Sequence, residues 1–210
     1  MSESTGEGAI ARLERVPGVS GPSTPWAGFV VGLVLWAIVV LPMVVGLVAL
    51  RNPRWYPIAD LAQTELRVRD VGTQHTPLIG LAGRIGDYFD AGSHPGPLSF
   101  YLMAPTYRLL GKSAFAFATS AVVLHALSVA LSLWLAHRRG RIPAMAGVAA
   151  GLAVLVRFYG PTVFFEPWNP YLPVMWWVTA LLAAWSVLDE DYVALPLFVL
   201  AGSFCAQTHL

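Results

Sequence analysis

The feature that most limits how this chain can fold is a run from Trp26 to Leu50 that contains no charged residue. A helix of about 20 apolar residues crosses the hydrocarbon core of a bilayer, so this run predicts a first transmembrane helix, kinked at Pro42. The composition agrees, because 56% of all residues are hydrophobic and 12% are charged, whereas roughly a quarter of the residues of a soluble domain are charged. We therefore expect an all-α fold, a polytopic transmembrane helix bundle.

Four more apolar runs predict four further spans, at about residues 113–136, 142–160, 171–188 and 192–208. The polar residues 1–25 lack the apolar segment and cleavage site of a secretory signal, and we interpret them as a disordered cytoplasmic tail. The chain stops directly after the last run. We therefore interpret residues 26–210 as the N-terminal part of a longer transmembrane domain.

A basic cluster sets the expected orientation. Residues 137–141 read His-Arg-Arg-Gly-Arg and follow the second predicted span. Positively charged residues beside spans stay in the cytoplasm, so the second span is expected to run inward and the first outward, with the N-terminus in the cytoplasm. Arg51 and Arg54, just after the first span, oppose this orientation, but three clustered arginines weigh more. Residues 51–112 are then an outer loop of a multi-pass protein of the cytoplasmic (inner) membrane.

The outer loop is predicted to contain two helices, and the first covers residues 57–71. The apolar face comprises Ile58, Leu61, Ala62 and Leu66, and the polar face comprises Asp60, Gln63, Thr64, Arg67 and Asp70. Such a helix lies in the membrane interface with one face in lipid. Glu65 and Arg69, four residues apart, are expected to pair, and Gly72 is the expected stop.

The second predicted helix of the loop, at residues 97–111, is rich in aromatic and apolar residues but is interrupted by Pro105 and Arg108. We interpret it as a juxtamembrane helix. If it crossed the membrane instead, every later segment would be inverted and the basic cluster would lie outside, which the distribution of positive charges disfavours.

Two carboxylates are candidates for chemistry. Asp60, on the polar face of the first loop helix, is placed to take a proton from an acceptor hydroxyl at the membrane surface; the alternative is a solvated carboxylate stabilised by the helix dipole. Glu166 precedes Pro167 at the outer end of an apolar segment. Carboxylates near membrane depth are costly and tend to be functional; the alternative is a loop glutamate that reaches water.

Several cationic or ligand-type side chains also lie in the outer loop. His94 begins a rigid His-Pro-Gly-Pro turn, where it would contact a phosphate or a sugar, or would be an ordinary loop histidine. Arg84 has the chemistry to neutralise a lipid phosphate. His75, Asp87 and Asp90 match no ligand spacing of a metal site. The chain carries no nucleotide-binding or serine-hydrolase motif, and its net charge of +1 gives no indication of nucleic-acid binding.

The order of these features resembles the front half of the GT-C class of membrane glycosyltransferases. It is most similar to the dolichyl-phosphate-mannose mannosyltransferases and the bacterial aminoarabinose transferases. The matching segments, across residues 27–210, are Ala-Asp-Leu-Ala-Gln-Thr-Glu at 59–65, His-Pro-Gly-Pro-Leu at 94–98, Trp-Leu-Ala-His-Arg-Arg at 134–139 and Glu-Pro at 166–167. Three positions depart from the family pattern: Leu61 replaces a common second acidic residue, His94 a common lysine, and Glu166 the usual aspartate.

The resemblance implies transfer of a sugar, outside the membrane, from a polyprenyl-phosphate donor to a hydroxyl of a glycan, lipid or protein acceptor. Asp60 would be the catalytic base, and Glu65, Arg84, His94 and Glu166 would bind substrate. Direct displacement would invert the anomeric configuration. No cofactor is implied, and the reaction does not demand a divalent metal ion.

Two other functions stay open. A transporter or flippase component would carry charges inside its spans and broken helices in matched halves, whereas a non-catalytic membrane scaffold would leave Asp60 as a solvated surface group. The predicted spans carry almost no charge, and the polar groups gather in one outer loop, so we favour the transferase.

Overall fold

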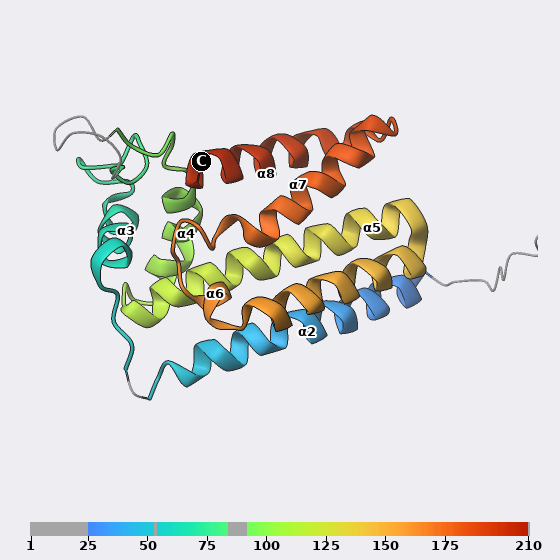
Figure 1. The fold of residues 1–210 in the computed structure, drawn as a ribbon, viewed down its shortest axis with the longest axis horizontal. Helices are drawn as coiled ribbons and strands as arrows, with labels where there is room; N and C mark the ends of the chain where they lie inside the picture. Colours follow the sequence, from blue (N-terminus) through green and yellow to red (C-terminus); the bar gives the residue numbers. More distant parts are fainter. Residues whose placement is uncertain (1–24, 53, 84–91, 210) are drawn as a thin grey trace, which may run out of the picture.

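The computed structural model describes residues 25–52, 54–83 and 92–209, and this part of the chain is all-helical (Figure 1). Its elements are α2 (Pro25–Ala49), α3 (Ala59–Asp70), α4 (Leu98–Leu109), α5 (Ala114–Tyr159), α6 (Thr162–Phe165), α7 (Pro173–Leu188), the 3-10 turn η1 (Tyr192–Ala194) and α8 (Leu195–Thr208). The expected all-α class is thereby confirmed for these residues. Arg84 and the predicted tail up to residue 24 lie outside the described residues.

Helix α5 is two antiparallel halves joined by a tight turn (Figure 1). Gly140 (φ −147°) and Arg141 (φ 55°, ψ −148°) have non-helical backbone angles. Arg141 has the left-handed φ at this break, and Pro143 then suits the first turn of the returning half, where its missing N–H is not needed. The halves coincide with the apolar runs 113–136 and 142–160.

The long helices pack around α5. Helix α2 packs against α5, and α7 packs against both α5 and α8. One buried cluster joins α2 to α5 and α6, and a second joins α4, α5, α7 and α8 around Tyr107, Trp176 and Phe204. Between α5 and α7 the hydroxyl oxygen of Thr179 lies 2.8 Å from that of Ser128 and 2.9 Å from that of Ser132, so these buried polar groups are satisfied.

Among the described residues, two helices are long and apolar enough to cross a membrane, at Trp26–Ala49 and Ala114–Tyr159. Helices α7 and α8 are apolar but shorter. One side of α2 is buried at Val39, Val40 and Met43, while Phe29 and Leu41 on the other side are 65% and 61% exposed. A bilayer would cover such a face.

The two ends of the bundle differ. Helices α3 and α4 lie across one end, beside the end of α8, and the turn of α5 lies at the other end with the α7–η1 connection (Figure 1). At that second end Arg138 Nε and Nη2 donate to the two carboxylate oxygens of Asp191, at 3.0 and 2.7 Å, and Arg139 pairs with Asp189. The polar loop and the basic cluster therefore occupy opposite ends.

One residue of α3 lies on a different side from the predicted one. Thr64, expected on the polar face, is buried together with Val68. Ile58 and Leu66, which were predicted to face lipid, are 75% and 55% exposed. The placement of Thr64 was wrong because α3 packs on α4 along its Thr64–Val68 side, and the hydroxyl of Thr64 is satisfied by the carbonyl oxygen of Asp60 at 2.8 Å. Gly72 (φ 74°) ends the helix as expected.

Candidate functional site

A buried tyrosine hydroxyl fixes α3 to α4. Tyr107 Oη donates to Glu65 Oε1 at 2.8 Å and accepts from Arg69 Nη2 at 3.5 Å. The expected pairing of Glu65 with Arg69 thus runs through a third residue. Burial raises the pKa of Tyr107 above its ordinary value, so the phenol stays protonated. The carboxylate of Glu65, predicted to bind substrate, is engaged inside the protein.

Asp60 lies in the first turn of α3, half-buried, at the polar end of the bundle. The residue before it, Ala59, has a φ of 48°, a conformation that residues with a Cβ rarely adopt. The chain thus makes a strained entry into α3 directly beside the candidate base, and backbone strain of this kind gathers at functional sites.

His94 is held by a short antiparallel pairing with residues 80 and 81. Its N–H donates to the carbonyl oxygen of Leu81 at 2.9 Å, and its own carbonyl accepts from the N–H of Gly80 at 3.0 Å. A side chain on Gly80 would put its Cβ 2.6 Å from the Cβ of His94, so glycine is required there. The ring Nε2 lies 2.9 Å from Asn169 Nδ2.

The surroundings of His94 keep its ring neutral. Burial, and then the ring of His209 at a centroid distance of 5.7 Å, lower the pKa of His94 below its ordinary value. With Asn169 as donor to Nε2, the ring carries its proton on Nδ1. A neutral imidazole of this kind offers hydrogen bonds to a sugar rather than a charge to a phosphate.

The turn that holds Glu166 also supplies Asn169, so Glu166 and His94 belong to neighbouring segments. Glu166 is half-buried, and burial raises the pKa of its carboxyl. Asn169 and His209 were not predicted as site residues from the sequence. The only signal for Asn169 was a polar amide between Trp168 and Pro170 in an otherwise apolar turn, and nothing local marked His209, which reaches this region because the end of α8 packs against α4.

Two arginines line a cavity where α2 ends and α5 begins. The cavity has a volume of about 430 Å³, and its walls include Arg51, Arg54, Trp55, Tyr56, Ser113 and Phe115. The guanidinium of Arg51 lies 4.7 Å from the centroid of the Phe115 ring. Ser113 Oγ accepts from the N–H of Ala116 at 3.1 Å and so caps the first turn of α5, which adds the positive end of a long helix to the arginine charges.

A second cavity, of about 550 Å³, shares part of these walls and extends toward α6. It is lined by Arg54, Trp55 and Tyr56 and by Pro161 and Phe165. Apolar and aromatic side chains thus surround Arg51 and Arg54. We call the two adjoining cavities together the arginine cavity. In the sequence, Arg51 and Arg54 stood out only because positive charges on the outer side of a span oppose the predicted orientation.

The polar end thus brings together part of the predicted set. Asp60 follows the arginine cavity by a few residues of chain, and the turn that holds Glu166 contacts His94 through Asn169. Within the described ranges, no group of three or more His, Cys, Asp or Glu residues is arranged to hold a metal ion. Comparisons with protein-family models, curated proteins and solved structures found no match to this chain, so the GT-C resemblance stays a prediction based on its motifs.

Proposed function

We propose that this chain is part of a glycosyltransferase of the cytoplasmic membrane, which moves a sugar from a polyprenyl-phosphate donor to an acceptor hydroxyl on the outer side. The proposal takes α2, the two halves of α5, and α7 and α8 as membrane-spanning, with the N-terminus in the cytoplasm. Large apolar side chains such as Phe29 and Leu41 stay exposed along α2. Contiguous apolar surface of this kind is rare on soluble monomers, whereas lipid would cover it.

The observation that carries the proposal is the arginine cavity. A lipid-linked phosphate needs cationic and apolar walls at one depth, because its chain stays in the bilayer while its charge stays at the interface. Arg51 and Arg54 supply the cations, and Trp55, Tyr56 and Phe115 supply aromatic rings. Trp and Tyr also favour the headgroup level of a bilayer, which agrees with this depth.

The proposed reaction is a direct displacement. The acceptor oxygen bonds to the anomeric carbon as the bond from that carbon to the phosphate oxygen breaks, and the phosphate leaves with the electron pair. Arg51 and Arg54 stabilise the charge that develops on the phosphate, and Asp60 receives the proton of the acceptor hydroxyl. His94, Asn169 and Glu166 offer hydrogen bonds to sugar hydroxyls.

The proposal is tested in cells that carry the intact gene. Lipid-linked sugar pools and surface glycans are compared between wild type, a deletion, Asp60→Asn and the control Asp70→Asn, at matched protein levels. Asp70 lies at the far end of the same helix. We expect Asp60→Asn to behave as the deletion does, with donor accumulating and one glycan lost, and Asp70→Asn to behave as wild type.

Two results would count against this assignment. If the deletion changes a glycan but Asp60→Asn does not, the base lies elsewhere, and Glu166→Gln is the next variant. If the deletion changes no glycan, the transferase proposal fails and a transport assay follows. The transporter alternative is less supported because the described residues bury no Asp, Glu, Lys or Arg side chain in the bundle interior.

A further inference from the structure

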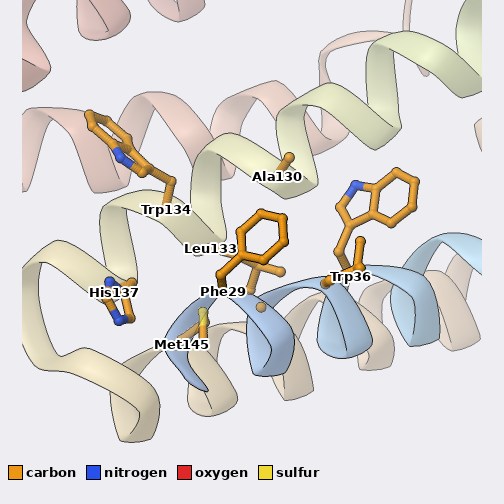
Figure 2. Close-up of a pocket in the computed structure, with 10 residues that line it drawn as sticks. Phe29, Trp36, Ala130, Leu133, Trp134, His137 and Met145 are labelled. Atoms are coloured by element: carbon orange, nitrogen blue, oxygen red, sulfur yellow. The ribbon is translucent and has the colours of Figure 1, made fainter. Parts of the chain in front are cut away.

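An apolar groove lies at the end of the bundle opposite α3 and α4. It runs between α2 and the two halves of α5 and has a volume of about 520 Å³. Figure 2 shows Phe29 and Trp36 on α2, Leu133, Trp134 and His137 on the first half of α5, and Met145 on its second half. His137 is its only charge-capable lining residue, and it lies beside the turn of α5.

Two glycines of α2 give this groove its depth. A Cβ at Gly28 would lie 2.7 Å from His137 Nε2, and one at Gly32 would lie 3.4 Å from Met145 Sδ. The glycines therefore let the α5 hairpin close onto α2, and the larger side chains of Phe29 and Leu33 rise at the edge, where they are 65% and 52% exposed.

One arginine beside the groove stays outside the ion pairs of this end. Arg138 and Arg139 are paired with Asp191 and Asp189. Arg141, in the turn itself, is exposed, and within the part of the chain that the structure describes no acidic group forms an ion pair with it. It lies four residues from His137 and four from Met145, both of which line the groove. The turn thus places an exposed arginine, which forms no ion pair with another described residue, a few residues of chain from one end of the groove.

We propose that this groove binds one acyl chain of an anionic phospholipid, whose phosphate is held by Arg141 and His137. An acyl chain matches the apolar walls, and a headgroup with net negative charge would pair with Arg141, which forms no ion pair with another described residue. Basic pockets between membrane helices recognise anionic headgroups in this way. The site lies at the other end of the bundle from Asp60, so it does not depend on the transferase proposal and requires only that α2 and α5 lie in a bilayer.

The test measures binding of two phospholipids to the purified full chain by native mass spectrometry in detergent. Phosphatidylglycerol and phosphatidylcholine with the same acyl chains are titrated. We expect phosphatidylglycerol to bind more tightly, and Arg141→Gln to weaken its binding by about fivefold, the effect of one cation near an anionic lipid headgroup. The matched control is Arg157→Gln. It removes an exposed arginine in the last turn of α5, away from the turn that holds Arg141, and should leave lipid binding unchanged.

A second pair of variants tests the groove itself. Ala130 is exposed and lines the groove, so Ala130→Leu fills it without changing the core and should weaken binding of both lipids. Ala150→Leu enlarges an exposed alanine on the returning half of α5, outside the groove, and should not. Gel filtration and circular dichroism check that each variant is folded.

Three outcomes would overturn the proposal. If the wild-type protein binds both lipids equally, the headgroup charge has no role. If Arg157→Gln loses as much lipid binding as Arg141→Gln does, the effect of Arg141 is not specific to the groove. If Ala130→Leu leaves lipid binding intact but converts a dimer to a monomer, a second copy of this chain fills the groove instead.

Discussion

The two ends of the bundle use their arginines differently. At the end with the α5 turn, Arg138 and Arg139 are paired with Asp191 and Asp189, so these arginines hold the α7–η1 connection against α5. At the end with α3 and α4, Arg51 lies over an aromatic ring and both Arg51 and Arg54 line an open cavity. Two arginines of the basic cluster at residues 137–141, which set the predicted orientation, thus form ion pairs inside the protein. Arg51 and Arg54 instead line a cavity that a ligand can enter.

The largest effect should come from removing the isolated pair. Replacing both Arg51 and Arg54 by Gln removes the groups that stabilise the leaving phosphate, and we expect the rate of donor consumption to fall by about 100-fold, as for loss of a preorganised charge stabiliser. The measurement is turnover of lipid-linked sugar in membranes that contain equal amounts of protein. The control replaces Arg138 and Arg139 by Gln, which should lower stability while retaining turnover. If both double variants lose the same amount of turnover, Arg51 and Arg54 have no role in turnover that Arg138 and Arg139 lack, which contradicts the proposed difference between the two ends.

The next effect concerns the attachment of α3 at the polar end. Tyr107→Phe removes the hydroxyl between Glu65 and Arg69 and leaves a half-buried carboxylate without its hydrogen bond, which should cost about 1 to 2 kcal/mol of unfolding free energy. Thermal unfolding followed by circular dichroism measures it. Tyr159→Phe, at an exposed ring at the end of α5, should change nothing. An unchanged transition in Tyr107→Phe would mean that the hydroxyl does not hold α3.

A smaller effect is expected at the entry to α3. Ala59→Gly removes the Cβ that a φ of 48° disfavours, so it should stabilise the protein by about 1 kcal/mol. Ala62→Gly, inside the same helix, should destabilise it by about 1 kcal/mol, because glycine is a poor helix former. Urea unfolding of the two variants compares them, and a loss of stability in both would place Ala59 in an unstrained conformation.

The smallest effect is a difference in the pH response of the two ends. The pKa of His94 is lowered from an ordinary value of 6.5, and that of Asp191 is lowered from 3.8, first by its hydrogen bonds from Arg138. A group with a lowered pKa in the folded state stabilises the protein above its ordinary pKa, and that contribution is lost as the pH falls. The contact of His94 with Asn169 should therefore weaken as the pH falls below about 6.5, whereas the contact of Arg138 with Asp191 should persist until the pH approaches 4.

Amide hydrogen exchange at pH 7.5 and 5.5, corrected for intrinsic rates, measures this difference. Residues 92–97 should lose protection at pH 5.5 relative to the α7–η1 connection, and His94→Gln should abolish the change. Loss of protection at both ends, or a response that survives in His94→Gln, would assign the titration to other groups.

Hydropathy and spacing were enough to predict the longer helices, because removal of apolar surface from water sets where they form. The runs 26–50 and 171–188 correspond to α2 and α7, and the glycine stop at Gly72 has the expected positive φ. Side-chain partners were harder to predict. Thr64 is buried because of where α4 lies, and Glu65 meets Arg69 through Tyr107, a residue 42 positions away from Glu65. Neither partner can be inferred from the periodicity of α3 alone.

The candidate site was predictable only in part, for the same reason. Asp60, His94 and Glu166 stand out as polar groups beside apolar runs, but Asn169 joins the last two only after the chain has folded. The arginine cavity forms where the end of α2 meets the start of α5, two segments separated by the whole outer loop. The spacing of residues along the chain therefore does not predict that the end of α2 and the start of α5 lie side by side.

The central claim is that the arginine cavity holds a polyprenyl phosphate, and photochemical labelling tests it most directly. A polyprenyl phosphate with a photoreactive group near its phosphate is irradiated with the full chain in detergent, and the labelled peptides are mapped by mass spectrometry with and without excess unlabelled polyprenyl phosphate. The account predicts competed labelling within residues 50–56 and 113–115, lost when Arg51 and Arg54 are both replaced by Gln. Competed labelling at the α5 turn, or labelling that the double replacement leaves unchanged, would contradict it.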